Sequence, residues 1–280
     1  MNIELEQIRD KQKESWNKFS PGWKKWDDLT MNFLQPHGEE IINMVNPGGS
    51  DHVLDIAAGT GEPGLTIASM LKDGKVVVTD LSEGMLRVAD DKAAALGLSN
   101  LETKVADACE LPFDDNTFDV VSCRLGFMFF PDMVLAAQEM VRVLKPGGRI
   151  ATTVWAGPEQ NFWITCMMQS IKKYIEMPQP PEGAPGMFRC AKPGLISELF
   201  KEVGLNNISE KEVSGKMTCQ NAEEYWDFMT DIAAPFVEAL SHTDEETREN
   251  IRKAVITTLN EKYPDQVVID SGGIAVYGEK

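Results

Sequence analysis

Apolar residues follow two alternating patterns along the first 155 residues of this 280-residue chain. Short runs rich in valine, isoleucine and leucine predict buried strands, and the longer segments between them carry apolar residues at helical spacing. The five predicted strands cover residues 53–56, 75–80, 101–105, 117–123 and 149–154. Because strands and helices alternate, we expect an α/β fold, with a mostly parallel sheet and helices on both of its faces.

Two amphipathic helical segments precede the first strand. We expect the first, residues 3–20, to end at the Ser20–Gly22 turn and the second to end at Pro36, because proline lacks the backbone donor that a helix needs. Three tryptophans lie in these segments: Trp16, Trp23 and Trp26. We assign residues 1–45 as an N-terminal helical arm, which either seals one edge of the domain or forms a lid over a substrate pocket.

The alternation changes after the fifth strand, where helical insertions rich in methionine and aromatic residues interrupt the late strands. The predicted elements are helices at 158–175 and 193–203, two helices within 221–262, and strands at 206–213 and 266–278. A Pro- and Gly-rich linker is expected at 178–186. We assign residues 46–280 to one domain, with its core motifs at 50–155 and helical cap elements at 156–192 and 218–264.

A glycine-rich turn joins the first strand to the helix that follows it. Gly59, Gly61 and Gly64 have the G-x-G-x-x-G spacing of a dinucleotide fingerprint, and Asp80 lies near the position expected for an acid that binds a ribose. At such a turn the backbone can approach a ligand closely, and the helix start offers free N–H groups. The spacing alone therefore leaves an NAD-type oxidoreductase as one reading.

Asp55, at the end of the first strand, distinguishes between two cofactors. A pyrophosphate over this turn would face a carboxylate in a poorly solvated pocket, which is unfavourable. S-adenosylmethionine (SAM) has a sulfonium and an ammonium group in place of the phosphates. The charge of Asp55 therefore favours SAM.

Acids also end the second and third strands. Asp80 can accept hydrogen bonds from both ribose hydroxyls. Asp107 can accept one from the adenine amino group, while the N–H of Ala108 faces a ring nitrogen and Leu81 and Met85 enclose the base. Because ligands of open α/β sheets bind at the carboxyl ends of the strands, three acids at successive ends indicate one site.

Five ordered motifs of this chain resemble class I SAM-dependent methyltransferases, in particular the branch of ubiquinone/menaquinone C-methyltransferases. The motifs are residues 53–61, 78–86, 106–113, 117–121 and 143–148. The resemblance implies a Rossmann-like, seven-stranded sheet with an antiparallel last strand, and SAM bound by Asp55, Gly59 and Gly61. Ala57 stands where many members have glycine, and Arg124 is expected to flank the methionine moiety of SAM.

The methyl acceptor is less specified by the sequence. Aromatic residues expected near the transferable methyl group are Trp16, Trp23, Phe127 and Phe129, although core packing explains the two phenylalanines equally well. We expect a small, apolar or aromatic acceptor, without an identified general base, since the histidines are scattered. Alternatives are a SAM-binding protein without transferase activity and a thiophilic acceptor that uses the cysteines.

Composition excludes several other classes. The net charge of −17 argues against nucleic-acid partners, because such binding depends on neutralising phosphates. The charged first ten residues do not form a secretory signal, and no apolar run is long enough to span a membrane. Five scattered cysteines without a C-x-x-C predict reduced thiols, no metal site and a cytoplasmic location.

Overall fold

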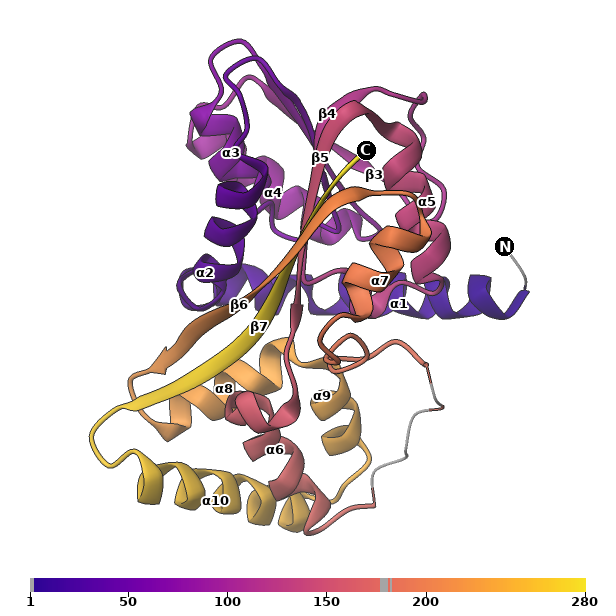
Figure 1. The fold of residues 1–280 in the computed structure, drawn as a ribbon. Helices are drawn as coiled ribbons and strands as arrows, with labels where there is room; N and C mark the ends of the chain where they lie inside the picture. The colour runs from indigo at the N-terminus through magenta and orange to yellow at the C-terminus, as the bar shows by residue number, and fades with distance from the viewer. Residues whose placement is uncertain (1–2, 177–180, 182) are drawn as a thin grey trace.

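The computed structural model describes residues 3–176, 181 and 183–280, and its centre is a seven-stranded sheet (Figure 1). The strands are β1 (His52–Ile56), β2 (Lys75–Asp80), β3 (Leu101–Val105), β4 (Phe118–Arg124), β5 (Leu144–Trp155), β6 (Asn206–Cys219) and β7 (Val267–Glu279). Their order is β3-β2-β1-β4-β5-β7-β6. The first five strands pair in parallel and β7 is antiparallel to both neighbours, so the predicted fold class is confirmed.

Helices cover both faces of the sheet. They are α1 (Ile3–Lys25), α2 (Asp27–Val45), α3 (Gly64–Met70), α4 (Glu83–Ala95), α5 (Met133–Val143), α6 (Phe162–Lys172), α7 (Leu195–Glu202), α8 (Ala222–Ile232), α9 (Ala234–Ser241) and α10 (Glu245–Lys262). Among the described residues, no helix combines the length and apolarity needed to cross a membrane.

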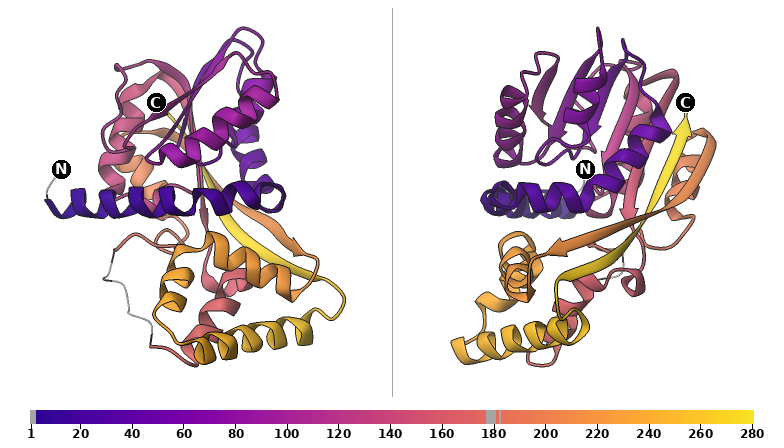
Figure 2. Two further views of the ribbon diagram at one scale, coloured as in Figure 1. Left: turned by 180° about the vertical axis from the view of Figure 1, so that it is seen from behind. Right: turned by 90° about the vertical axis from the view of Figure 1, so that its left-hand side faces the viewer.

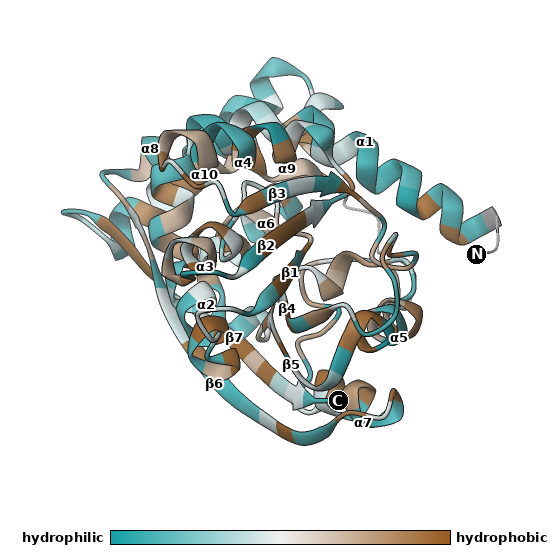
Figure 3. Cartoon of the chain, turned by 90° about the horizontal axis from the view of Figure 1, so that it is seen from above, coloured by the Kyte–Doolittle hydropathy of each residue, from teal (hydrophilic) through white to brown (hydrophobic). Residues whose placement is uncertain are grey.

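The central strands are apolar on both faces, as the hydropathy colouring of β1 and β2 shows (Figure 3). Successive side chains of a strand point to opposite faces. Val53 packs in a cluster with residues of α2 and α3, whereas its neighbour Leu54 packs in a larger cluster that includes α5 and α7. The continuous hydrophobic runs of the sequence therefore reflect burial on both sides of the sheet.

The prediction that α1 ends at Ser20–Gly22 is wrong, because the helix continues through Pro21 to Lys25. Pro21 cannot donate to the carbonyl one turn earlier, which belongs to Asn17. The hydroxyl of Ser20 donates to that oxygen instead, at 2.9 Å. A local side-chain hydrogen bond thus replaces the backbone bond that proline removes.

Other boundaries also differ from the prediction. Helix α2 continues through Pro36, whose ring packs beside Gly215 of β6. Strand β6 extends to Cys219, and the 221–262 segment forms three helices because Pro235 starts α9 in its first turn. Residues 178–180 and 182 of the linker predicted at 178–186 lie outside the described residues.

Strands β6 and β7 extend beyond the sheet as a long twisted ribbon (Figures 1 and 2). At its far end lie α6, α8, α9 and α10, which together we call the cap. Helix α1 lies between the sheet and the cap in each of the views. The arm therefore separates two lobes of the molecule.

Asn161, at the start of α6, joins the cap to the sheet. It is fully buried, and its amide donates to the carbonyls of Ala156, Gly157 and Gly272. Its oxygen accepts from the Trp163 indole at 2.9 Å and from the Gly272 backbone. The side chain of Asn161 thus forms hydrogen bonds both with backbone groups at the end of the β5–β7 pair and with Trp163 in the first turn of α6.

Replacing this side chain should destabilise the protein strongly. We expect Asn161→Ala to lower the free energy of unfolding by about 3 kcal/mol, because several buried polar groups lose their partners. The exposed Asn206→Ala should change it by less than about 0.5 kcal/mol. Urea denaturation of the two variants measures the difference, and similar midpoints would contradict this role of Asn161.

Candidate cofactor and acceptor site

The glycine turn after β1 has the backbone that a closely bound ligand needs. Ala57 and Gly59 adopt φ values of 54° and 55°, in the left-handed region. A methyl group added at Gly59 would meet nothing within 4 Å, whereas one at Gly64 would lie 2.5 Å from Val78 Cγ1. Gly59 therefore leaves open space above the turn, and Gly64 lets α3 pack closely on the strands.

Asp55 is completely buried beneath this turn. One carboxylate oxygen accepts from the Gly64 N–H at 2.9 Å and the other from the Ser122 hydroxyl at 2.7 Å. Burial raises the pKa of Asp55 to about 7, and these hydrogen bonds oppose the shift. A cation placed nearby would favour the ionised form.

Asp80 connects β2 to the same turn. Its carboxylate accepts from the Gly59 N–H at 2.9 Å and from the Ser82 N–H at 2.8 Å. Burial raises the pKa of Asp80, and these backbone hydrogen bonds counteract the rise. Ser82 caps α4 by accepting from the N–H of Met85, which is buried in the first turn, next to the half-buried Leu81.

Asp107, after β3, has one oxygen without a hydrogen bond. Its Oδ1 accepts from the Cys109 N–H at 2.8 Å. Its Oδ2 is buried and accepts no hydrogen bond from the described residues, while Arg9 Nη1 lies 3.9 Å away. Because a buried carboxylate oxygen without a donor is costly, this atom is suited to a ligand N–H. Ala108 lies beside it and is also buried.

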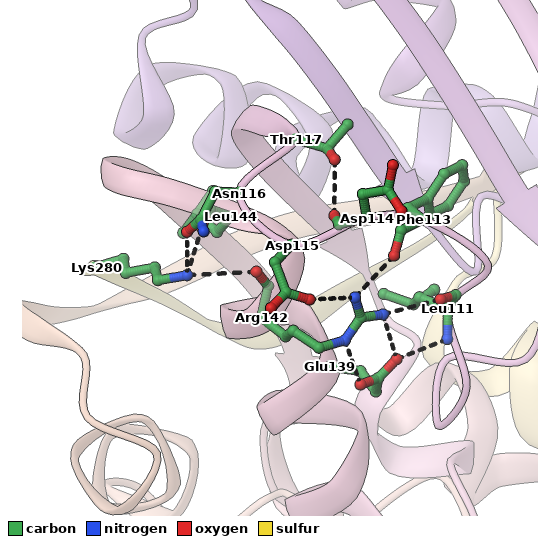
Figure 4. Close-up of polar contacts among 10 residues, drawn as sticks. All are labelled: Leu111, Phe113, Asp114, Asp115, Asn116, Thr117, Glu139, Arg142, Leu144 and Lys280. Atoms are coloured by element: carbon green, nitrogen blue, oxygen red, sulfur yellow. Dashed lines mark hydrogen bonds and ion pairs between the residues drawn. The ribbon is translucent and has the colours of Figure 1, made fainter.

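The loop that follows Asp107 is held by Arg142 of α5 (Figure 4). The guanidinium donates to the Leu111 and Phe113 carbonyls and pairs with Glu139 and Asp115. The neighbouring Glu139 carboxylate also accepts from the Leu111 N–H. This network fixes the β3–β4 loop, whose first residues carry the adenine-binding candidates.

Arg124 ends β4 on the face of the sheet that α2 covers. Its Nη2 lies 3.9 Å from Met31 Sδ, and no carboxylate of the described residues lies within 4 Å of the guanidinium. Burial lowers the pKa of Arg124, whereas the more distant Glu62, Asp55 and Asp27 raise it. Among the described residues, this partly desolvated guanidinium therefore has no ion-pair partner.

Helix α1 lies across the carboxyl ends of the strands (Figure 2). Its Asn17 side chain accepts from the Ser82 hydroxyl at 2.8 Å and from the Gly84 N–H at 3.0 Å, at the start of α4. At the start of α2, Asp27 accepts from the Thr60 hydroxyl of the glycine turn at 3.3 Å. The arm therefore contacts the glycine turn and the start of α4.

Three of the four predicted acceptor residues come together where α1 of the arm meets the segment after β4. Trp16 meets Trp23 and Phe129 edge to face, with ring centroids 6.0 and 5.4 Å apart. Phe127 is separate from this group. It is fully buried and packs on Phe130 and Phe200 in the core, which gives its ring a structural role.

Other candidate chemistry is absent from the described residues. His37 is buried against Trp155, and burial lowers its pKa to about 3, so its imidazole stays neutral. The described residues include no group of three or more potential metal ligands. Burial raises the pKa of all five thiols, and all five are buried, which removes the basis for a thiophilic acceptor site.

The sequence analysis did not identify Asn17, Asp27 or Thr60. Asn17 and Ser82 are 65 positions apart, and Asp27 and Thr60 are 33 apart. A polar residue on an amphipathic helix is ordinarily solvated, so nothing local indicated these contacts. The buried Asp55, the part-buried Asp80 and Asp107, a carboxylate oxygen without a donor among the described residues and an open glycine backbone fit a cationic nucleoside such as SAM.

Comparisons with known proteins agree with this arrangement. Residues 53–148 match the family model described as a methyltransferase domain. Over 208 residues, the chain is 31% identical to the demethylmenaquinone methyltransferase of Bacillus subtilis (strain 168), covering 69% of this chain and 82% of that protein. The corresponding protein of Listeria monocytogenes serotype 4a (strain HCC23) is 28% identical over 217 residues, covering 71% and 89%.

Solved structures share the fold. The YcgJ protein of Bacillus subtilis superposes with a TM-score of 0.59 at 22% identity, over 88% of this chain and 98% of that one. The family match identifies SAM, not a nicotinamide dinucleotide, as the cofactor and the reaction as methyl transfer. The chain belongs to the SAM-dependent methyltransferase family.

Proposed function

We propose that this methyltransferase acts on a small, apolar or aromatic acceptor of the quinol type. The observation that carries the proposal is the aromatic group that Trp16 and Trp23 of the arm form with Phe129 after β4. Edge-to-face rings offer an aromatic ligand favourable contacts. The relatives named demethylmenaquinone methyltransferases support the same acceptor class.

We propose that SAM binds along the carboxyl ends of β1, β2 and β3. In this arrangement Asp80 accepts from the ribose hydroxyls, and Asp107 Oδ2 accepts from the adenine amino group. Leu81, Met85 and Ala108 enclose the base. The methionine end lies over Ala57, Gly59 and Gly61, between Asp55 and Arg124, whose opposite charges match its ammonium and carboxylate groups.

Bound SAM supplies an electrophilic methyl group on a sulfonium. The residues of this chain supply position and exclude water, because α1 covers the cofactor residues and aromatic rings surround the acceptor. A neutral, buried His37 is unsuited to strong base catalysis. We therefore propose catalysis by alignment and desolvation, without an assigned general base.

The acidic charge of −17 and the five buried, unpaired thiols support two further proposals. We propose that the protein has no nucleic-acid partner, since phosphate contacts require basic surface. We also propose a cytoplasmic location, where thiols stay reduced.

Asp107→Asn tests the adenine contact. The amide keeps the oxygen that accepts from Cys109 and replaces Oδ2 by a donor, so we expect the dissociation constant of SAM to rise about tenfold. Asp73→Asn, at the amino end of β2, is the matched control and should leave it unchanged. Calorimetric titration measures both, and equal affinities would remove Asp107 from the site.

Because the pKa of Asp55 is raised, we predict that this carboxyl releases protons when SAM binds. The folded carboxyl titrates at about 7 and the unfolded one at 3.8, so the ligand-free protein should lose stability as pH rises between these values. A bound cation lowers this pKa. SAM binding at pH 7 should therefore release about half a proton more from the wild type than from Asp55→Asn.

Calorimetry in buffers of different ionisation enthalpy counts these protons. The ammonium group of SAM contributes equally in both proteins, so the difference isolates Asp55. The same proton count for wild type and variant would show that Asp55 does not face the cationic part of the cofactor.

The acceptor class can be tested with a panel of hydrophobic phenols and quinols against polar amines and thiols. Transfer of a labelled methyl group should occur only to the aromatic set, and Phe129→Ala should raise KM for these acceptors about tenfold, through lost ring contact. Phe162→Ala is the control, because this ring packs on Tyr263 of the cap and not on Trp16. Turnover of amines or thiols alone would refute the proposal.

A further inference from the structure

We propose that Asp231, in the cap, is a positioning residue that latches the N-terminal arm over the cofactor and so sets the rate of cofactor exchange. The latch acts on the joint between α1 and α2, which we define as residues 25–27. The inference rests on the proposed cofactor position, and it adds a role to a residue far from every methyltransferase motif.

The cap side of the latch is a set of contacts to one carboxylate. Asp231 Oδ2 accepts from the Trp26 indole at 2.8 Å and pairs with Lys25 Nζ at 2.7 Å. The Trp26 ring also meets Phe228 of α8 edge to face, with centroids 5.8 Å apart. A methyl group at Gly22 would lie 2.3 Å from the Asp231 carbonyl oxygen, so α1 and α8 touch through their backbones.

The cofactor side of the joint begins at the next residue. Asp27 Oδ1 accepts from Thr60 of the glycine turn at 3.3 Å and pairs with Lys92 of α4 at 3.0 Å. Thr60 is 2% exposed, so this contact lies within the turn. Three consecutive residues therefore connect α8 of the cap to both the glycine turn and α4.

Helix α1 closes the region above the cofactor residues. Arg9 lies at Asp107 after β3, Asn17 binds the start of α4 after β2, and Trp16 meets Phe129 after β4. A ligand held by Asp80 and Asp107 has this helix above it. Cofactor entry and exit therefore require the arm to move away from the strand ends, and that movement must break the contacts of the joint.

Asp231 belongs to the cap and is not among the proposed cofactor contacts. Weakening the latch should thus favour the open arm equally in the free and the bound protein. Association and dissociation rates then rise by the same factor, and the dissociation constant stays unchanged. A residue that binds the cofactor directly behaves differently, because its loss raises the dissociation constant.

The test uses stopped-flow binding of S-adenosylhomocysteine, followed by tryptophan fluorescence, on the full chain. We expect Asp231→Ala to raise both rate constants about tenfold, the equivalent of losing one hydrogen bond to a charged acceptor. Trp26→Phe keeps an aromatic ring next to Phe228 and removes the indole N–H that Asp231 accepts, so it should also raise both rates. Asp227→Ala, an exposed acid one turn earlier on α8, is the matched control.

Two outcomes would overturn the latch. Rates equal to wild type in both Asp231→Ala and Trp26→Phe would show that the joint does not limit exchange. A raised dissociation constant with an unchanged association rate would show that these residues act on the bound ligand. Thermal unfolding of each variant identifies a loss of folding, and the conservative Trp26→Phe carries the test if Asp231→Ala does not fold.

Failure of the latch differs from failure of the proposed cofactor site. If Asp107→Asn binds SAM as the wild type does, the site itself is misplaced. If Asp107→Asn weakens binding while the latch variants exchange at the normal rate, the site stands and the latch falls.

Discussion

The burial of one carboxylate at the end of β1 organises this molecule. Asp55 can be buried only because the Gly64 N–H and the Ser122 hydroxyl donate to it. The first contact requires a helix start without a side chain, since a methyl group at Gly64 would clash with Val78. The pairing of β1 with β4 brings the second donor into place. The burial of Asp55 therefore depends both on the pairing of β1 with β4 and on the glycine at position 64.

The same arrangement places charged side chains at one edge of the sheet, where they complement the charges of the proposed cofactor. Parallel strands end at one edge of the sheet, so the acids near the ends of β1 and β2 and after β3 lie at the same edge. Arg124 adds a positive charge at the end of β4 that forms no ion pair within 4 Å among the described residues. An ordinary protein interior would pair or exclude such groups, because isolated buried charges are costly. Their presence here is consistent with a zwitterionic, cationic ligand.

The arm connects the two lobes of the molecule. Asn161 fixes the cap to β5 and β7, and the joint between α1 and α2 connects α8 to the glycine turn. The acceptor proposed to lie beneath the arm would therefore be enclosed by the helix that also covers the cofactor. One element closes both halves of the site, which suits a reaction that depends on alignment and exclusion of water.

The sequence by itself determined the sheet, the glycine turn and the acids at the strand ends, because these depend on local patterns: alternation of elements, apolar runs and a fixed spacing of glycines. The tertiary structure decided the course of the arm and the cap. Helices continued through Pro21 and Pro36 because the Ser20 hydroxyl and packing on β6 compensate there. Asn17, Asp27 and Asp231 have partners between 33 and 206 positions away, so their roles follow only from contacts that the fold creates.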